Sequence, residues 1–212
     1  MMDLYWWSLW VLGGLAFFEP CTIATHTMLA AQCHRAGGRE RWKPLLSMWL
    51  SRLGLLALLL LLLLLLLPPI HWGREFKAGL LLFLAVVYIV SRFRYLPIPH
   101  LELFRIWPGG QNLPLAIRLG WTLPACTLPL FGVVAAITLS VHTLAFALLA
   151  AAIFGTLFSL PVIIFALMGL RPSVRRLLTA AAQLTPFLTA MVLLGAALYE
   201  ILPPHWLRKL MF

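Results

Sequence analysis

The residues of this sequence best suited to chemistry are two cysteines that stand close to prolines in apolar segments. Cys21 follows Pro20 in the run EPCTIATHTMLAAQ, and Cys126 lies two residues after Pro124 in the run LPACTLPLFGVVAAI. Two thiols within bonding distance form a disulfide that stores two electrons, and exchange with another protein requires an accessible thiolate. The two runs therefore indicate a candidate redox pair.

Cysteine also has a simpler role, because a free cysteine is most often a small buried apolar residue. This alternative stays open for Cys21 and Cys126. Cys33 lies twelve residues after Cys21, which is ~18 Å along an unbroken helix. We therefore expect Cys33 to be a spectator thiol away from the pair.

Glu19 stands directly before Pro20 in a segment that otherwise reads as a membrane span. A carboxylate within the membrane is by default a candidate functional group, and protons must be managed when a disulfide becomes two thiols. One interpretation is that Glu19 accepts a proton during exchange; the other is that Glu19 is protonated or hydrogen-bonded to a broken helix end and is only structural. Thr22 and Thr127 are candidate polar residues of the same cavity.

A soft metal ion is the alternative ligand for these segments. Glu19, Cys21, His26 and Cys126 combine carboxylate, thiolate and imidazole donors that such an ion accepts. If the cysteines instead form the redox pair, no metal and no other cofactor is required, because the pair itself carries the electrons.

The composition places the chain in the membrane. Of its 212 residues, 63% are hydrophobic and 10% are charged, whereas roughly a quarter of the residues of a soluble domain are charged. The net charge of +10 comes from basic residues scattered at the ends of apolar segments, and not from a continuous basic stripe, so we expect a lipid bilayer and no nucleic acid as partner. We predict one membrane domain over residues 1–212, with no cleaved signal peptide.

The hydropathy pattern predicts an all-α membrane protein with six transmembrane helices. The expected spans are 6–32, 44–67, 76–96, 114–140, 144–170 and 177–202. With both termini outside, most basic residues fall in inward loops, as the positive-inside rule requires. These inward residues are Arg35, Arg39, Arg41, Lys43, Arg92, Arg94, Arg105, Arg118, Arg171, Arg175 and Arg176. Arg52 is expected near the inner end of the second span.

Six spans divide into two halves of three helices, and an odd number per half turns the second half upside down relative to the first. We expect repeat 1 over about 1–100 and repeat 2 over about 110–212, joined by a connector rich in Pro and Gly. Such a repeat would bring Cys21 and Cys126 together near the midplane. Pro20, Pro124 and Pro129 would break or hinge the helices there, because proline removes a backbone donor.

These Pro-flanked cysteines in two inverted halves resemble the membrane thiol–disulfide electron transporters of the CcdA family and of the transmembrane domain of DsbD. The family pattern is approximately Pro-Cys-x-x-Pro in each half. Pro129 matches its downstream proline in the second half, whereas Ala24 stands at that place in the first. The family does not supply Glu19.

The resemblance implies a protein of the bacterial inner membrane with both termini extracytoplasmic. It implies transfer of electrons from cytoplasmic thioredoxin to an extracytoplasmic thioredoxin-like acceptor, for cytochrome c biogenesis or related protein maturation. An enzyme of this kind would be a thiol–disulfide oxidoreductase acting as a protein-disulfide reductase.

Two other functions remain open for the same scaffold. One is a transporter for a soft metal ion, and the other is a membrane assembly subunit without catalytic chemistry. Five residues of the fifth and sixth spans could line the central cavity, although structural packing is the favoured role for each of them. They are Ser159, Pro161, Gln183, Thr185 and Pro186.

Overall fold

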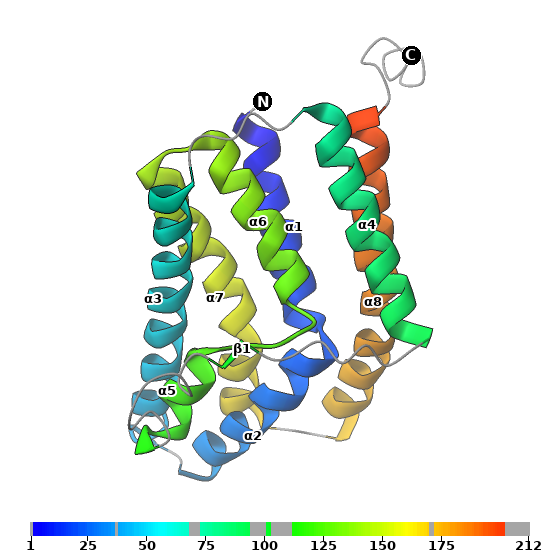
Figure 1. Cartoon of the computed structure of the whole chain (residues 1–212). Helices are drawn as coiled ribbons and strands as arrows, with labels where there is room; N and C mark the ends of the chain where they lie inside the picture. Colours follow the sequence, from blue (N-terminus) through cyan, green and yellow to red (C-terminus); the bar gives the residue numbers. More distant parts are fainter. Residues whose placement is uncertain are drawn as a thin grey trace.

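The computed structural model describes residues 2–36, 38–67, 73–93, 101–102, 112–169 and 172–201, and nearly all of these residues are helical (Figure 1). The helices are α1 Met2–Phe18, α2 Pro20–Ala36, α3 Trp42–Leu66, α4 Arg74–Phe93, α5 Leu115–Gly120, α6 Leu128–Val141, α7 Leu144–Met168 and α8 Pro172–Ile201. Two short strands, β1 Leu101–Glu102 and β2 Thr122–Leu123, pair in antiparallel fashion. Most of the expected connector between the repeats lies outside the described residues. Three basic residues expected in inward loops, Arg94, Arg105 and Arg171, also lie outside them.

Among the described residues, three helices are long and apolar enough to cross a membrane as single spans. They comprise Trp42–Leu66, Leu144–Met168 and Thr179–Leu198, and they correspond to the second, fifth and sixth expected spans. Each exceeds or equals the ~20 residues that a helix needs to cross the hydrocarbon core. The protein is therefore a helical membrane protein.

The first expected span is a bent pair of helices. Trp6–Phe18 and Pro20–Arg35 together pass the same test of length and composition, and their axes differ by 67°. Counted as one span, this pair raises the number of candidate spans among the described residues to four. The break follows from Pro20, which suits the first position of a new helix, where its missing N–H costs nothing.

The third and fourth expected spans contain shorter apolar helices, Ala78–Val90 and Leu128–Val141. In the fourth, the chain does not continue as one helix: α5 ends at Gly120, β2 and a turn follow, and α6 begins at Leu128. The six-span count and the inverted repeat therefore stay predictions, and the β1–β2 pair is an element that an all-α expectation lacks.

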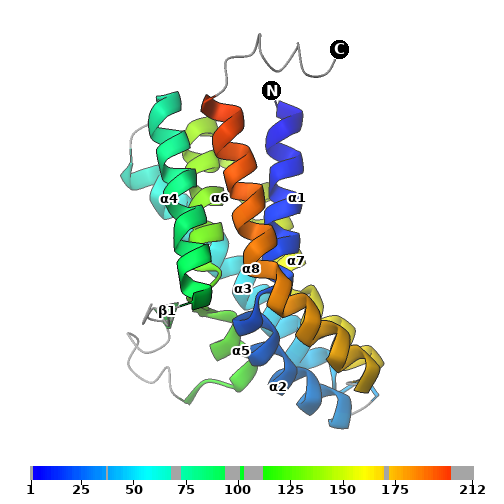
Figure 2. The same cartoon turned by 90° about the vertical axis from the view of Figure 1, so that its right-hand side faces the viewer.

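The packing of the helices follows the division of the chain into two halves. Two of the main contacts join a helix of the first half with one of the second: α3 packs against α7, and α4 packs against α8. The two parts of the bent pair, α1 and α2, both contact α7, whereas α5 and α6 both contact α3. Figure 2 shows α1 beginning and α8 ending at the same end of the bundle, with α2 and the first part of α8 inclined at the other end.

Two glycines allow close contacts between α3 and its neighbouring helices. A Cβ on Gly120 would lie 2.6 Å from the Ser51 Cβ and 2.8 Å from the Met48 carbonyl oxygen, so α5 rests directly on the α3 backbone. A Cβ on Gly155 of α7 would lie 2.7 Å from a Leu53 methyl carbon. Small residues at such crossings are typical of helices packed in membranes.

The outer surface is apolar and the interior holds the polar residues. Large hydrophobic side chains are exposed along α3, α4 and α8, and Leu65 is 84% exposed. The buried polar and charged residues, in contrast, lie inside the bundle. These buried residues include Glu19, Thr22, His26, Arg52, Thr127, Ser159, Thr185 and Thr189. An apolar exterior around a polar interior is the arrangement expected in a lipid bilayer.

Candidate functional site

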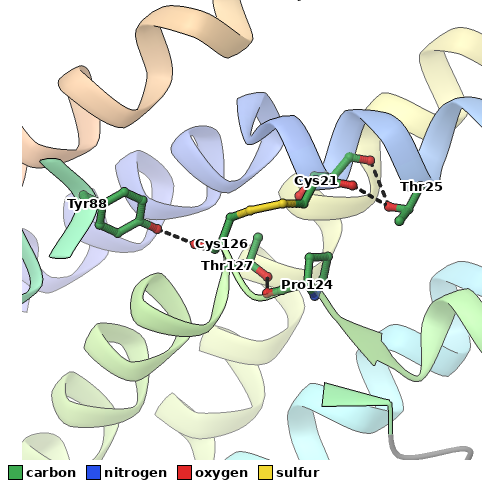
Figure 3. Close-up of a disulfide and its surroundings, with 7 residues drawn as sticks. Cys21, Thr25, Tyr88, Pro124, Cys126 and Thr127 are labelled. Carbon is green, nitrogen blue, oxygen red and sulfur yellow. Dashed lines mark hydrogen bonds between the residues drawn. A yellow bond between two sulfur atoms is a disulfide. The ribbon is translucent and has the colours of Figure 1, made fainter. Parts of the chain in front are cut away.

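A disulfide joins the two predicted cysteines. Cys21 and Cys126 are 105 residues apart in the chain, their Cα atoms are 6.5 Å apart, and their sulfur atoms are bonded (Figure 3). Both side chains are half-buried. The structure thus brings together the two cysteines that the sequence predicted to meet, each at a break in an apolar segment.

The first turn of α2 positions Cys21. Pro20 is the first residue of the helix, and the amide of Ile23 donates to the carbonyl oxygen of Glu19, which fixes the turn around Cys21. One turn further, the Thr25 hydroxyl lies 3.0 Å from the Cys21 carbonyl oxygen and 3.1 Å from that of Thr22 (Figure 3). The backbone at Cys21 is therefore held by helix hydrogen bonds and by a threonine side chain.

A turn rather than a helix positions Cys126. The backbone amide and the hydroxyl of Thr127 both donate to the carbonyl oxygen of Pro124, at 3.0 and 2.8 Å (Figure 3). Pro129 follows in the first turn of α6, where its missing donor is tolerated. Two of the predicted hinge prolines thus lie in and next to the turn that carries Cys126, and Thr127 is a buried residue of this turn.

Tyr88 of α4 contacts this turn and lies near Glu19. Its hydroxyl donates a hydrogen bond to the Cys126 carbonyl oxygen (Figure 3), and its side chain is close enough to the Glu19 carboxyl group to interact with it electrostatically. Glu19 is only 1% exposed, and its Oε1 atom has no hydrogen-bond partner among the described residues. A buried carboxyl group therefore lies next to the disulfide with one oxygen free.

The Phe18 carbonyl oxygen, at the break between α1 and α2, accepts a hydrogen bond from a side chain of α8. The Thr185 hydroxyl lies 3.2 Å from the Phe18 carbonyl oxygen and 2.8 Å from that of Ala181. Thr185 stands directly before Pro186, a proline inside α8. Of the five residues considered as cavity lining, Thr185, Ser159 and Pro161 are buried, whereas Gln183 is half-buried and Pro186 is half-buried as well.

Arg52, like Tyr88, is a buried residue that sequence reasoning did not assign to the site. It was expected near the inner end of its span, and the structure places its side chain inside the bundle, 1% exposed. Its Nη1 lies 2.7 Å from His26 Nε2 and 3.4 Å from Ser159 Oγ. The sequence signal was present, because a cation within an apolar span faces the interior of the bundle as a rule.

Cys33 does not belong to the pair. It is a free thiol, buried in a small apolar cluster with Leu29, Ala30 and Val162. It lies near the end of α2, while Cys21 lies near its beginning. This position agrees with the expectation of a spectator thiol.

The donors of the metal alternative do not gather into a site. Within the described ranges, no three His, Cys, Asp or Glu side chains come together in a way that could hold a metal ion. The sulfurs of Cys21 and Cys126 are bonded to each other, and His26 Nε2 faces the Arg52 guanidinium. The geometry gives no support to Glu19, Cys21, His26 and Cys126 as a ligand set.

Comparison with protein-family models, curated proteins and solved structures gave no significant match for this chain. The function of the protein is therefore inferred from the residues of the site and from their geometry.

Proposed function

We propose that this protein carries electrons across a bacterial inner membrane by thiol–disulfide exchange through Cys21 and Cys126. The observation that carries the proposal is the disulfide itself, which links two helix breaks from opposite halves of an apolar chain. A purely structural cross-link would not need a break at both of its ends. The resemblance to CcdA and to the transmembrane domain of DsbD points to the same chemistry.

The packing of the helices supports two inverted repeats. An exchange of the two halves would replace α3 by α7, α4 by α8, and the broken pair α1–α2 by the broken pair α5–α6. The contacts α3–α7 and α4–α8 map onto themselves under this exchange, and the contact of α1–α2 with α7 maps onto that of α5–α6 with α3. Such a pseudo-two-fold relation places the two breaks side by side, as in transporters built from inverted repeats.

The proposed reaction conserves atoms and electrons. A thiolate of the reduced donor attacks one sulfur of the Cys21–Cys126 disulfide, the S–S bond breaks, and the other cysteine leaves as a thiolate that takes up a proton. The second donor thiol then resolves the mixed disulfide. The donor loses two electrons and two protons, and the cysteine pair gains them. The reverse steps reduce an acceptor disulfide on the other side.

Glu19 is suited to manage the proton in these steps. It is buried, it stands two residues before Cys21, and it lies near Tyr88, whose hydroxyl contacts the backbone of Cys126. A protonated Glu19 can donate to the leaving thiolate and accept the proton again in the reverse step. The free Oε1 atom is the oxygen available for this transfer.

The partners of the reaction are two soluble proteins and the lipid bilayer. We propose cytoplasmic thioredoxin as the donor and an extracytoplasmic thioredoxin-like protein as the acceptor, in cytochrome c biogenesis or related protein maturation. Both termini of the chain would then lie on the extracytoplasmic side. No prosthetic group takes part, because the cysteine pair stores the electrons.

Mass-tagging of free thiols tests this proposal directly. In a Cys33→Ser background, only Cys21 and Cys126 remain to be tagged. The oxidised protein in lipid nanodiscs should take up no tag, and incubation with reduced thioredoxin, its reductase and NADPH should expose both thiols. A pair that stays reduced under oxidising conditions, or that thioredoxin never reduces, contradicts the proposal. Protection that depends on an added metal ion would indicate metal transport instead.

A further inference from the structure

The structure contains a buried cation for which no acidic partner is present among the described residues. Arg52 lies in the middle of the apolar helix α3, and no described carboxylate forms an ion pair with it. A charged side chain inside a membrane is costly and persists only where other contacts compensate. The contacts of Arg52 therefore indicate what the residue does.

Four groups surround the Arg52 guanidinium. Nη1 donates to His26 Nε2 at 2.7 Å and to Ser159 Oγ at 3.4 Å, and Nη2 donates to the Leu119 carbonyl oxygen at 2.9 Å. The guanidinium carbon also lies 4.2 Å from the centre of the Phe158 ring, a cation–π contact. Because arginine has only donors, His26 must accept through Nε2.

These partners belong to the segments that carry the two cysteines. His26 is in α2, five residues after Cys21, and Leu119 is in α5, seven residues before Cys126. Ser159 belongs to α7, against which α2 packs. The Arg52 side chain on α3 thus contacts both segments whose cysteines form the disulfide.

The continuity of α3 makes it a suitable support. It runs unbroken from Trp42 to Leu66, Gly120 next to Leu119 allows α5 to touch its backbone, and Gly155 allows α7 to pack closely on its Leu53 and Leu56 side chains. The cysteine-bearing segments, in contrast, are interrupted by breaks next to Cys21 and Cys126. Arg52 therefore reaches the two interrupted segments from a continuous helix.

From these contacts we infer that Arg52 is a positioning residue for the redox pair, a clasp that keeps the Cys21 and Cys126 segments together when the disulfide is open. This inference rests on the proposed function. Two thiols held in place behave as if each were present at a high effective concentration for the other, which stabilises the disulfide. Loss of the clasp lowers that effective concentration and makes the disulfide easier to reduce.

The planar guanidinium is essential to this role. It presents donors in a fixed fork and reaches His26 and Leu119 at once, whereas the lysine ammonium is a compact charge on a flexible stem. A clasp therefore requires arginine, while simple stabilisation of a thiolate by a positive charge would be satisfied by lysine. A single substitution, Arg52→Lys, therefore distinguishes the positioning role from stabilisation of a thiolate.

The experiment measures the equilibrium of the Cys21–Cys126 pair in dithiothreitol redox buffers, with mass-tagging as the readout and Cys33→Ser as the background. We expect Arg52→Gln to lower the equilibrium constant for disulfide formation about tenfold, which corresponds to ~30 mV for a two-electron couple. Arg52→Lys should shift it in the same direction. Arg39→Gln, a change at an exposed residue of the loop before α3, is the matched control and should leave it unchanged.

His26 provides an independent pair of variants in case Arg52→Gln does not fold. His26→Gln retains an acceptor for Arg52 and should stay close to the parent, whereas His26→Phe removes the acceptor and should shift the equilibrium toward the dithiol. A parent-like value for Arg52→Lys, or equal values for the two His26 variants, would overturn the clasp.

A failure of the proposed function would look different. The clasp is measured on the isolated pair, without thioredoxin, so it can stand even if no electrons cross the membrane. If the Cys21–Cys126 pair never oxidises, the proposed electron transfer fails. The positioning role of Arg52 is then tested by the rate at which a short bifunctional maleimide cross-links the two thiols. Arg52→Gln and Arg52→Lys should each slow this cross-linking, and unchanged rates would contradict the inference.

Discussion

The Tyr88 hydroxyl donates a hydrogen bond to the backbone carbonyl oxygen of Cys126, although the two residues are 38 positions apart and belong to different halves of the chain. The bond ties the turn that carries Cys126 to α4. Tyr88 also lies near the carboxyl group of Glu19, which stands two residues before Cys21.

Replacement of Tyr88 by phenylalanine should therefore loosen the site without disturbing its apolar packing. We expect a loss of about 1 kcal/mol in the free energy of unfolding, the scale of a hydrogen bond in a membrane protein. Equilibrium unfolding in mixed micelles measures it. Thr27→Ala, which removes an exposed hydroxyl bonded to the Ala24 carbonyl oxygen, is the control and should have a smaller effect.

Replacement of Glu19 by glutamine should slow exchange, because the amide keeps the shape of the side chain but cannot transfer a proton. General acid–base groups contribute about 10²–10⁴-fold to rates, and we expect a loss at the lower end of that range. Stopped-flow measurement of disulfide reduction by thioredoxin tests this expectation. Glu40→Gln, in an exposed pair with Lys43, should be silent. An unchanged rate in Glu19→Gln would leave the carboxyl group with a structural role only.

The two kinds of cysteine should respond differently to removal. Cys126→Ser should abolish electron transfer from thioredoxin to the outer acceptor, since the disulfide can no longer form. Cys33→Ser should leave transfer largely intact, because Cys33 is a free thiol packed in an apolar cluster. Reduction of an acceptor enclosed in proteoliposomes measures both. Equal losses would contradict the pairing of Cys21 with Cys126.

Two threonines one turn apart in α8 form a matched pair for stability. The Thr185 hydroxyl contacts the Phe18 carbonyl oxygen at the break between α1 and α2, whereas the equally buried Thr189 Oγ1 has no hydrogen-bond partner among the described residues. Thr185→Val should lower the free energy of unfolding by about 1 kcal/mol. Thr189→Val should be neutral or stabilising, because it removes an unsatisfied polar atom. Thermal unfolding of both variants decides the comparison.

Gly120 should tolerate no side chain. The Cβ of Gly120→Ala would overlap the Met48 carbonyl oxygen and the Ser51 Cβ, so α5 must move away from α3. Overpacking of this kind typically costs about 1–3 kcal/mol. Gly132→Ala, at a glycine of α6 with open space around it, is the control and should be neutral. If the clasp is correct, Gly120→Ala also weakens the Cys21–Cys126 disulfide, since Leu119 moves with α5.

Much of the fold and part of the site could be predicted because the relevant signals are local. Apolar stretches long enough to span a membrane, and prolines next to Cys21 and Cys126, depend only on neighbouring residues. The prediction of a break in the first and fourth segments agrees with the bend after Phe18 and with the turn between α5 and α6. The burial of Arg52 and its contacts could not be predicted, because charge alone does not tell which side chains of other helices will surround it.

By itself, the sequence determined the class of the protein, the positions of its apolar helices and the two cysteines proposed as a redox pair. Only the tertiary structure decided that Cys21 bonds Cys126, that Tyr88 faces the Cys126 backbone, that Thr185 contacts the carbonyl group left open at Phe18, and that Arg52 reaches both cysteine-bearing segments. The physical reason is distance along the chain. Hydropathy and proline act within one turn of a helix, whereas these contacts join residues from separate helices and exist only after the helices have packed.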